Sequence, residues 1–101
     1  MDKYQVKLYK RAYRDIAGIY AYIASEKLSP ENAYGQVKRI REAILGLDTF
    51  PQSHQERQVG KYANKGYRQL LIDNYVAIFK INEKKKIVNV ITMQYQGRQL
   101  T

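Results

Sequence analysis

The spacing of hydrophobic positions changes near the start of the chain and separates the first two elements. In residues 4–9, "YQVKLY", apolar and polar side chains alternate, which predicts a half-buried strand. From residue 10 to residue 27 the apolar positions lie three or four residues apart, which predicts an amphipathic helix. The face of this helix that we expect to be buried carries Tyr13, Ile16, Tyr20 and Ile23.

A second amphipathic helix follows after a short connection. Ser29 can cap its start, Pro30 suits the first helical position, and Glu31 favours the positive end of the helix dipole. The apolar stripe of this helix comprises Ala33, Val37, Ile40, Ile44 and Leu47. Because so short a connection makes consecutive helices antiparallel neighbours, we expect a helical hairpin. The proline in "FPQS" then stops the second helix.

The second half of the chain contains a polar loop and three strands. Residues 52–66 have no hydrophobic period, which predicts a loop that presents Arg57, Lys61 and Lys65 to solvent; a short strand near residues 59–62 is an option. Strands are predicted over residues 67–72, 75–81 and 86–95, with a tight turn at "DN" and a second turn at "NEKK". The middle strand is apolar on both faces, which is typical of a central strand.

The order of one strand, two helices and three strands predicts an α+β fold. We expect the helical hairpin to pack on one face of a twisted sheet whose last three strands form an antiparallel meander. The pattern does not determine where the N-terminal strand joins this sheet. A length of 101 residues without a linker or repeat predicts a single domain over residues 1–101.

The composition excludes several classes of site. The chain has no cysteine, which excludes disulfides and thiolate ligands, and its single histidine cannot form a dedicated transition-metal site. No nucleotide-binding fingerprint is present, so we expect neither a metal nor a cofactor. No apolar run approaches the roughly 18 residues of a membrane span, and the N-terminus does not resemble a signal peptide. We therefore expect a cytoplasmic protein without membrane contacts.

The formal net charge of +9 is the strongest indication of function in the composition. A charge of this size favours polyanions or acidic protein partners, although surface lysines and arginines also serve solubility. We expect Arg68 and the end of the last strand, with Tyr95 and Arg98, to meet at one rim of the sheet, close to Lys61 and Lys65. Such donors could hold phosphates or the carboxylates of an acidic partner.

Proton-transfer candidates are few. His54 is the only histidine and could act as a general base, although a loop histidine is more often simply exposed. Tyr95 would serve better as an acid than as a base, because the pKa of an unperturbed tyrosine is about 10.

Four segments of the chain resemble the RelE/ParE superfamily of toxins from bacterial type II toxin–antitoxin systems. The segments are "YQVKLYKRAYRDIAGIYAYIA", "ILGLDTFP", "GYRQLLIDNYVAIFKI" and "VNVITMQYQGR", and together they cover most of the chain. The resemblance implies a helical hairpin on a twisted antiparallel sheet. It also implies a cognate acidic antitoxin, encoded by an adjacent gene, that wraps the toxin in a hetero-oligomer.

The superfamily contains ribosome-dependent endoribonucleases that cut messenger RNA and ParE-like members that bind and poison DNA gyrase. Ribonuclease members that resemble this chain carry an arginine near the position of Val76 and often a further basic residue near Gln96. Both positions are neutral here, which favours the ParE-like class. The residues expected to bind the target are then Arg57, Lys65, Arg68, Tyr95 and Arg98.

Two alternatives remain open at this stage, and with them whether the chain is an enzyme. In a RelE-type ribonuclease acting on the ribosome and mRNA, the phosphate-binding residues would be Lys61, Lys65, Arg68 and Arg98. Tyr95 or His54 would then transfer protons. A small basic nucleic-acid-binding module is the second alternative, and its affinity would fall steeply with salt.

Overall fold

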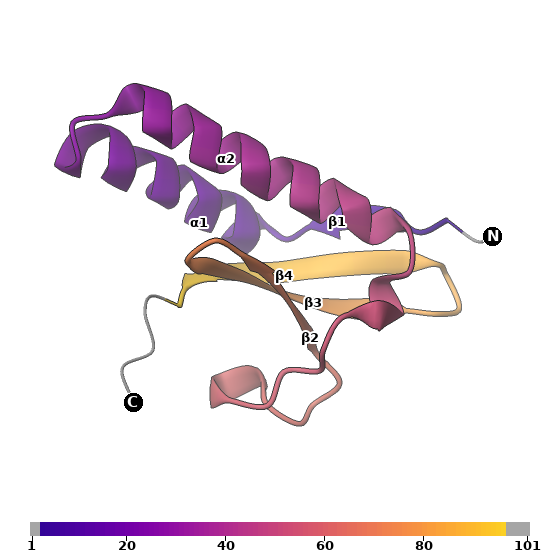
Figure 1. Cartoon of the computed structure of the whole chain (residues 1–101). Helices are drawn as coiled ribbons and strands as arrows, with labels where there is room; N and C mark the ends of the chain where they lie inside the picture. Colours follow the sequence, from indigo (N-terminus) through magenta and orange to yellow (C-terminus); the bar gives the residue numbers. More distant parts are fainter. Residues whose placement is uncertain (1–2, 97–101) are drawn as a thin grey trace.

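The computed structural model describes residues 3–96 and has two layers, a helical hairpin and a four-stranded sheet (Figure 1). The elements are β1 (Gln5–Leu8), α1 (Lys10–Ala21), a π-helical turn (Tyr22–Glu26), α2 (Pro30–Leu45), β2 (Arg68–Ile72), β3 (Tyr75–Asn82) and β4 (Ile87–Tyr95). Short 3₁₀ turns occur at Gly46–Asp48, Pro51–Ser53 and Gly60–Tyr62. Both helices lie on one face of the sheet, which confirms the predicted α+β arrangement.

The N-terminal strand completes the sheet at β4. The strand order is β1-β4-β3-β2, and β1 runs parallel to β4 with Val6 opposite Val88. A parallel pair needs a long crossover connection, and here the helical hairpin begins that connection. The other two pairings are antiparallel, as the meander predicts.

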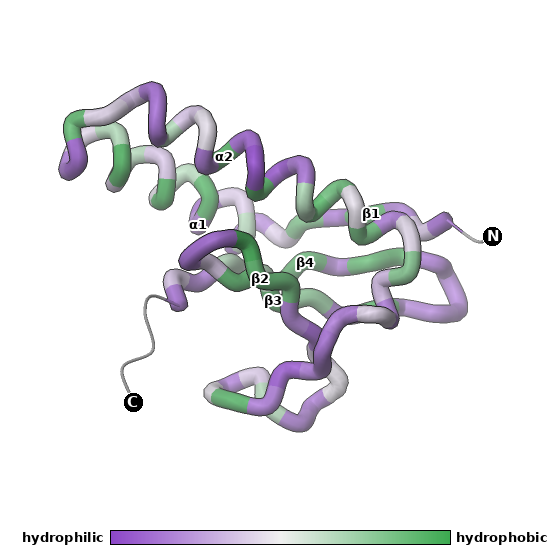
Figure 2. The backbone as a smooth tube through the Cα atoms, in the orientation of Figure 1, coloured by the Kyte–Doolittle hydropathy of each residue, from purple (hydrophilic) through white to green (hydrophobic). Residues whose placement is uncertain are grey.

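The central strand β3 is buried on both faces over its first five residues. Tyr75, Ala77 and Phe79 belong to the core under the helices, whereas Val76 and Ile78 point to the opposite face of the sheet. This burial confirms the prediction of an apolar central strand. Figure 2 shows the same hydrophobic stretch along β3 and β4.

The prediction for the buried face of the first helix is partly wrong. Tyr13 and Tyr20 are 62% and 41% exposed, whereas Ala12 is fully buried. Ile16 and Ile19 are the α1 side chains that pack against the core. Because tyrosine is amphipathic and the two stripes are adjacent on the helix, spacing alone could not decide which one faces the sheet.

One carboxylate links α1 to an irregularity in β4. The register between β3 and β4 shifts at Ile78/Phe79, opposite Thr92. Asp15 accepts hydrogen bonds there from the Thr92 hydroxyl at 2.5 Å and from the Met93 backbone N–H at 2.9 Å. The pairing of β1 with β4 ends at Val90, and Asp15 satisfies the Met93 backbone donor beyond that end.

Among residues 3–96, no helix has both the length and the apolar character needed to cross a membrane.

Candidate functional site

The polar loop folds back against the sheet on the side away from the helices (Figure 1). Residues 55–57 run beside the start of β2, since Gln69 N–H donates to the Gln55 carbonyl at 2.9 Å and Arg57 N–H to the Tyr67 carbonyl at 2.7 Å. The optional strand near residues 59–62 is not formed, because Gly60–Tyr62 is a 3₁₀ turn. The strand-like pairing lies earlier, between Glu56 and Arg68.

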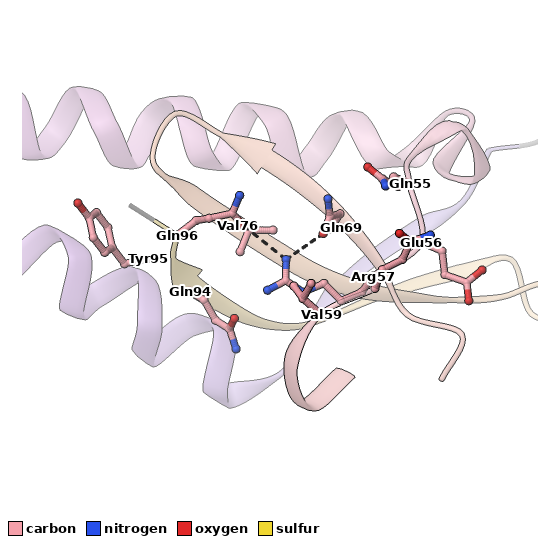
Figure 3. A pocket seen from close by; sticks show the side chains of 10 residues that line it. Gln55, Glu56, Arg57, Val59, Gln69, Val76, Gln94, Tyr95 and Gln96 are labelled. Atoms are coloured by element: carbon pink, nitrogen blue, oxygen red, sulfur yellow. Dashed lines mark hydrogen bonds between the residues drawn. The ribbon is translucent and has the colours of Figure 1, made fainter. Parts of the chain in front are cut away.

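This loop, β2 and the end of β4 enclose an open hollow of about 400 Å³ on the sheet face. Its lining is rich in glutamine, as Figure 3 shows. The lining residues are Gln55, Glu56, Arg57, Gln58, Val59, Gln69, Val76, Gln94, Tyr95 and Gln96. The hollow is therefore polar, with Val76 as a fully buried apolar patch in its lining.

Arg57 is the only cation among the described residues of this lining, and it is not presented to solvent as predicted. Its side chain is largely covered, with 9% of the residue exposed. Its Nη1 donates to Gln69 Oε1 at 2.8 Å and, more weakly, to Gln96 Oε1 at 3.4 Å. Because Gln69 lies on β2 and Gln96 follows β4, the guanidinium bridges across β3, the strand that carries Val76 (Figure 3).

The charge of Arg57 is not neutralised by the described residues. No carboxylate of residues 3–96 forms an ion pair with it, and its Nε is buried without an acceptor. An unpaired buried cation costs several kcal/mol, and buried donors are normally satisfied. The hollow therefore presents an uncompensated positive charge with unused donors.

The predicted meeting of Arg68 with the end of the last strand is wrong. Both β2 and β4 run antiparallel to β3, so they run in the same direction. Arg68 lies opposite Phe79, whereas Tyr95 lies opposite Tyr75 at the other end of β3. The Nη1 of Arg68 donates instead to the His54 carbonyl at 2.7 Å, so this guanidinium helps to hold the start of the loop.

Of the remaining predicted residues, Tyr95 lines the hollow with Arg57, whereas Lys61 and Lys65 are not part of its lining. Lys61 and Lys65 are exposed on the loop, with the Lys61 ammonium 5.8 Å from the ring centre of Tyr62. The Tyr95 ring packs edge-on against Tyr75 at 5.6 Å and points away from Arg57 (Figure 3). Arg98 lies outside the described residues.

His54 is half-buried, with its ring edge-on to Phe79 at 5.8 Å. Burial lowers the pKa of His54 below its usual 6.5, and the nearby Arg68 charge lowers it further. The imidazole is therefore neutral at physiological pH. No group of three acidic or histidine side chains within residues 3–96 could hold a metal ion.

Sequence reasoning missed the glutamine side chains that position Arg57. It treated Gln96 only as a neutral replacement for a basic residue and did not consider Gln69. A signal was present, since Gln94 and Gln96 are two residues apart and so share one face of an extended chain. Their pairing with a loop arginine depends on the loop fold, which the sequence pattern does not specify.

The fold has close relatives among solved toxin structures. The chain resembles one in "Chromosomal ParDE TA system from P. aeruginosa", with TM-score 0.76, 20% identity, and 92% of this chain and 96% of that chain covered. It also resembles a chain of the Mycobacterium tuberculosis RelBE2 complex, with TM-score 0.63, 15% identity, and 97% of this chain and 97% of that chain covered. A chain of the Pyrococcus horikoshii OT3 RelE-RelB complex is similar with TM-score 0.62, 16% identity, and 96% of this chain and 99% of that chain covered. The fold is thus that of RelE/ParE toxins.

A comparison of the sequence with protein families identifies the family to which the chain belongs. The model of the family described as "ParE toxin of type II toxin-antitoxin system, parDE" matches residues 6–100. The chain belongs to this family of ParE toxins, within the RelE/ParE superfamily. No curated protein sequence matches it significantly.

Proposed function

We propose that the chain inhibits growth by binding DNA gyrase, and that an acidic antitoxin encoded beside it neutralises this activity. Family membership supports the toxin role. In this proposal the target is a cytoplasmic protein, and the chain recognises it without catalysing a reaction on it.

The observation that carries the proposal is the lining of the hollow around Arg57. A ribonuclease must activate a 2′-hydroxyl, stabilise the charged phosphate in the transition state and protonate the leaving oxygen. Among the described residues, the hollow offers one guanidinium held by glutamine amides. The resemblance to RelE-type ribonucleases implies an arginine near the position of Val76, where this chain has an apolar residue. Such a surface suits recognition of a partner better than acid–base chemistry.

The positions of the other candidates support the same choice. Arg68 lies opposite Phe79 and Tyr95 opposite Tyr75, so the two are separated along β3, and Arg68 donates to a carbonyl. Lys61 lies on the loop at the 3₁₀ turn, and His54 is packed against Phe79. Among the described residues, these groups do not converge on a point where an RNA phosphate could react.

The antitoxin half of the proposal rests on charge and on the relatives. The chain carries a net charge of +9, which a bound acidic segment would offset. The structural relatives from M. tuberculosis and P. horikoshii come from toxin–antitoxin complexes. We expect the antitoxin segment to be disordered when free and to fold on this surface as a helix or an added strand.

Brief expression of the chain in growing bacterial cells tests the proposal. Plasmid isolated after induction should lose negative supercoils on gels that separate topoisomers, while mapped 5′ ends of messages should show no new cuts in translated regions. Normal plasmid supercoiling together with new cuts in translated messages would overturn the gyrase proposal in favour of a RelE-type ribonuclease.

A further inference from the structure

The Arg57 guanidinium has one edge that the chain leaves unused. Both hydrogen bonds of its side chain come from Nη1, to Gln69 and Gln96. The Nε–H and Nη2 together form the opposite edge, and neither donates to a described residue. We propose that this edge is a carboxylate site that receives one Asp or Glu side chain of the antitoxin. The choice of the antitoxin as the partner rests on the proposed function.

The geometry of the unused edge fits a carboxylate. The Nε–H and one Nη2–H are parallel donors on a planar group, so a carboxylate can accept from both in a bidentate pair. Such a pair would satisfy the buried Nε and neutralise the charge in a single contact. The hydrogen bonds from Nη1 to the two glutamine oxygens hold the plane of the guanidinium in place before the partner arrives.

The other described residues of the lining add hydrogen-bond donors but no second positive charge. Gln55, Gln94 and other glutamines line the hollow, and their amide nitrogens can also donate to a carboxylate. Among the described residues of the lining, Arg57 is the only basic one and Glu56 the only acidic one. A single guanidinium suits a single acidic side chain, whereas a nucleic-acid strand with its repeated phosphates would call for several cations.

Access to this edge requires a small movement of the atoms that cover it. The Nε is shielded from solvent, so a side-on carboxylate must displace some of the atoms that cover it. The backbone next to Arg57 is held by hydrogen bonds from Arg57 N–H to the Tyr67 carbonyl, from Gln69 N–H to the Gln55 carbonyl and from Asn64 N–H to the Arg57 carbonyl. The site is therefore partly closed in the free chain and opens as the partner enters.

The first test observes the arginine side chains of the full-length chain directly. We would label the arginines with ¹⁵N and follow each Nε–H signal by NMR while adding sodium propionate, whose carboxylate and alkyl group match a glutamate side chain. The Arg57 signal, assigned by its loss in R57K, should shift and saturate at a concentration at least about tenfold lower than the signal of exposed Arg41. Sodium chloride at the same ionic strength is the control and should not shift the Arg57 signal.

Three outcomes of that titration would overturn the site. They are no saturable shift at Arg57, equal shifts at all arginines, or tighter saturation by inorganic phosphate than by propionate, which would indicate a site for nucleic-acid phosphate. The readout does not involve gyrase. Saturation by propionate in a chain that leaves gyrase unaffected would support the site while contradicting the gyrase proposal.

The second test assigns the source of the carboxylate. R57Q and R41Q each remove one positive charge, but only R57Q removes the guanidinium in the hollow. Affinity for the acidic protein encoded by the adjacent gene, measured by calorimetry, should fall at least about tenfold for R57Q and remain within about twofold for R41Q. Equal losses in the two variants would overturn the assignment to the antitoxin.

Discussion

Arg57 and Val76 line the same hollow on the sheet, the first from a loop and the second from the central strand. Val76 is fully buried, and the Arg57 guanidinium bridges the strands on either side of it. The described cation in this hollow thus comes from the loop, and β3 contributes a buried valine. This arrangement underlies the first two predictions.

Val76→Arg should destabilise the chain without creating a ribonuclease. The new side chain would enter a fully buried position and bring a second unpaired cation close to Arg57, at a cost of about 3–5 kcal/mol. Urea unfolding followed by circular dichroism measures the loss. Leu71→Arg is the matched control, because Leu71 pairs with Val76 on the same face but is 55% exposed, and its effect should stay below about 1 kcal/mol. Equal losses would contradict this explanation.

Arg57→Met should leave the free energy of unfolding unchanged or raise it by about 1–2 kcal/mol. The methionine keeps an apolar stem over the sheet and removes a buried charge that no described carboxylate neutralises. Its urea midpoint and slope should be compared with those of the wild type. A loss above about 1 kcal/mol would mean that the bonds to Gln69 and Gln96 are structural, and the case for an uncompensated binding group would fail.

Much of the fold could be predicted from the sequence because long segments keep one hydrophobic period. The helical hairpin and the buried central strand follow from such periods. The pairing of β1 with β4 could not be predicted, because a four-residue strand has too few side chains to indicate which edge of the sheet it joins. The exposed Tyr13 shows the same limit, since an amphipathic side chain fits either of two neighbouring helix faces.

The site was less predictable than the fold for a specific reason. Arg57 was identified as a candidate, but its burial depends on a loop without periodicity and on two glutamines from separate strands. The expected meeting of Arg68 with Tyr95 failed because β2 and β4 run in the same direction on either side of β3. The start of β2 therefore lies level with Val90 in the middle of β4, away from its end.

Asp15→Ala should lower the free energy of unfolding by about 2–3 kcal/mol. The substitution leaves the buried Thr92 hydroxyl and the Met93 N–H at the β4 irregularity without their shared acceptor. Asp15→Asn retains an oxygen acceptor and should lose about half as much. Chemical denaturation of both variants at the same pH measures the difference, and equal losses would show that the carboxylate acts only through its charge.

Stability should decrease as the pH falls below about 6.5 through the ionisation of His54. Because folding lowers the pKa of His54, the unfolded chain binds the proton more tightly, and stability is lost between 6.5 and the lowered pKa. His54→Phe keeps a ring beside Phe79 and should abolish the loss in this range. Urea unfolding from pH 7.5 to 5.0 tests this. Asp73 and Glu83 also have lowered pKa values, but their contributions are lost only at more acidic pH, below about 4.5.

The measurement that tests the central claim most directly is the supercoiling of relaxed plasmid by purified DNA gyrase in the presence of the purified chain. Wild type and R41Q should inhibit supercoiling at similar concentrations, whereas R57Q should need at least about tenfold more protein, because it lacks the guanidinium in the hollow. Undiminished supercoiling at every concentration of the wild-type chain, with ribosome-bound message cut by the same preparation, would contradict the account.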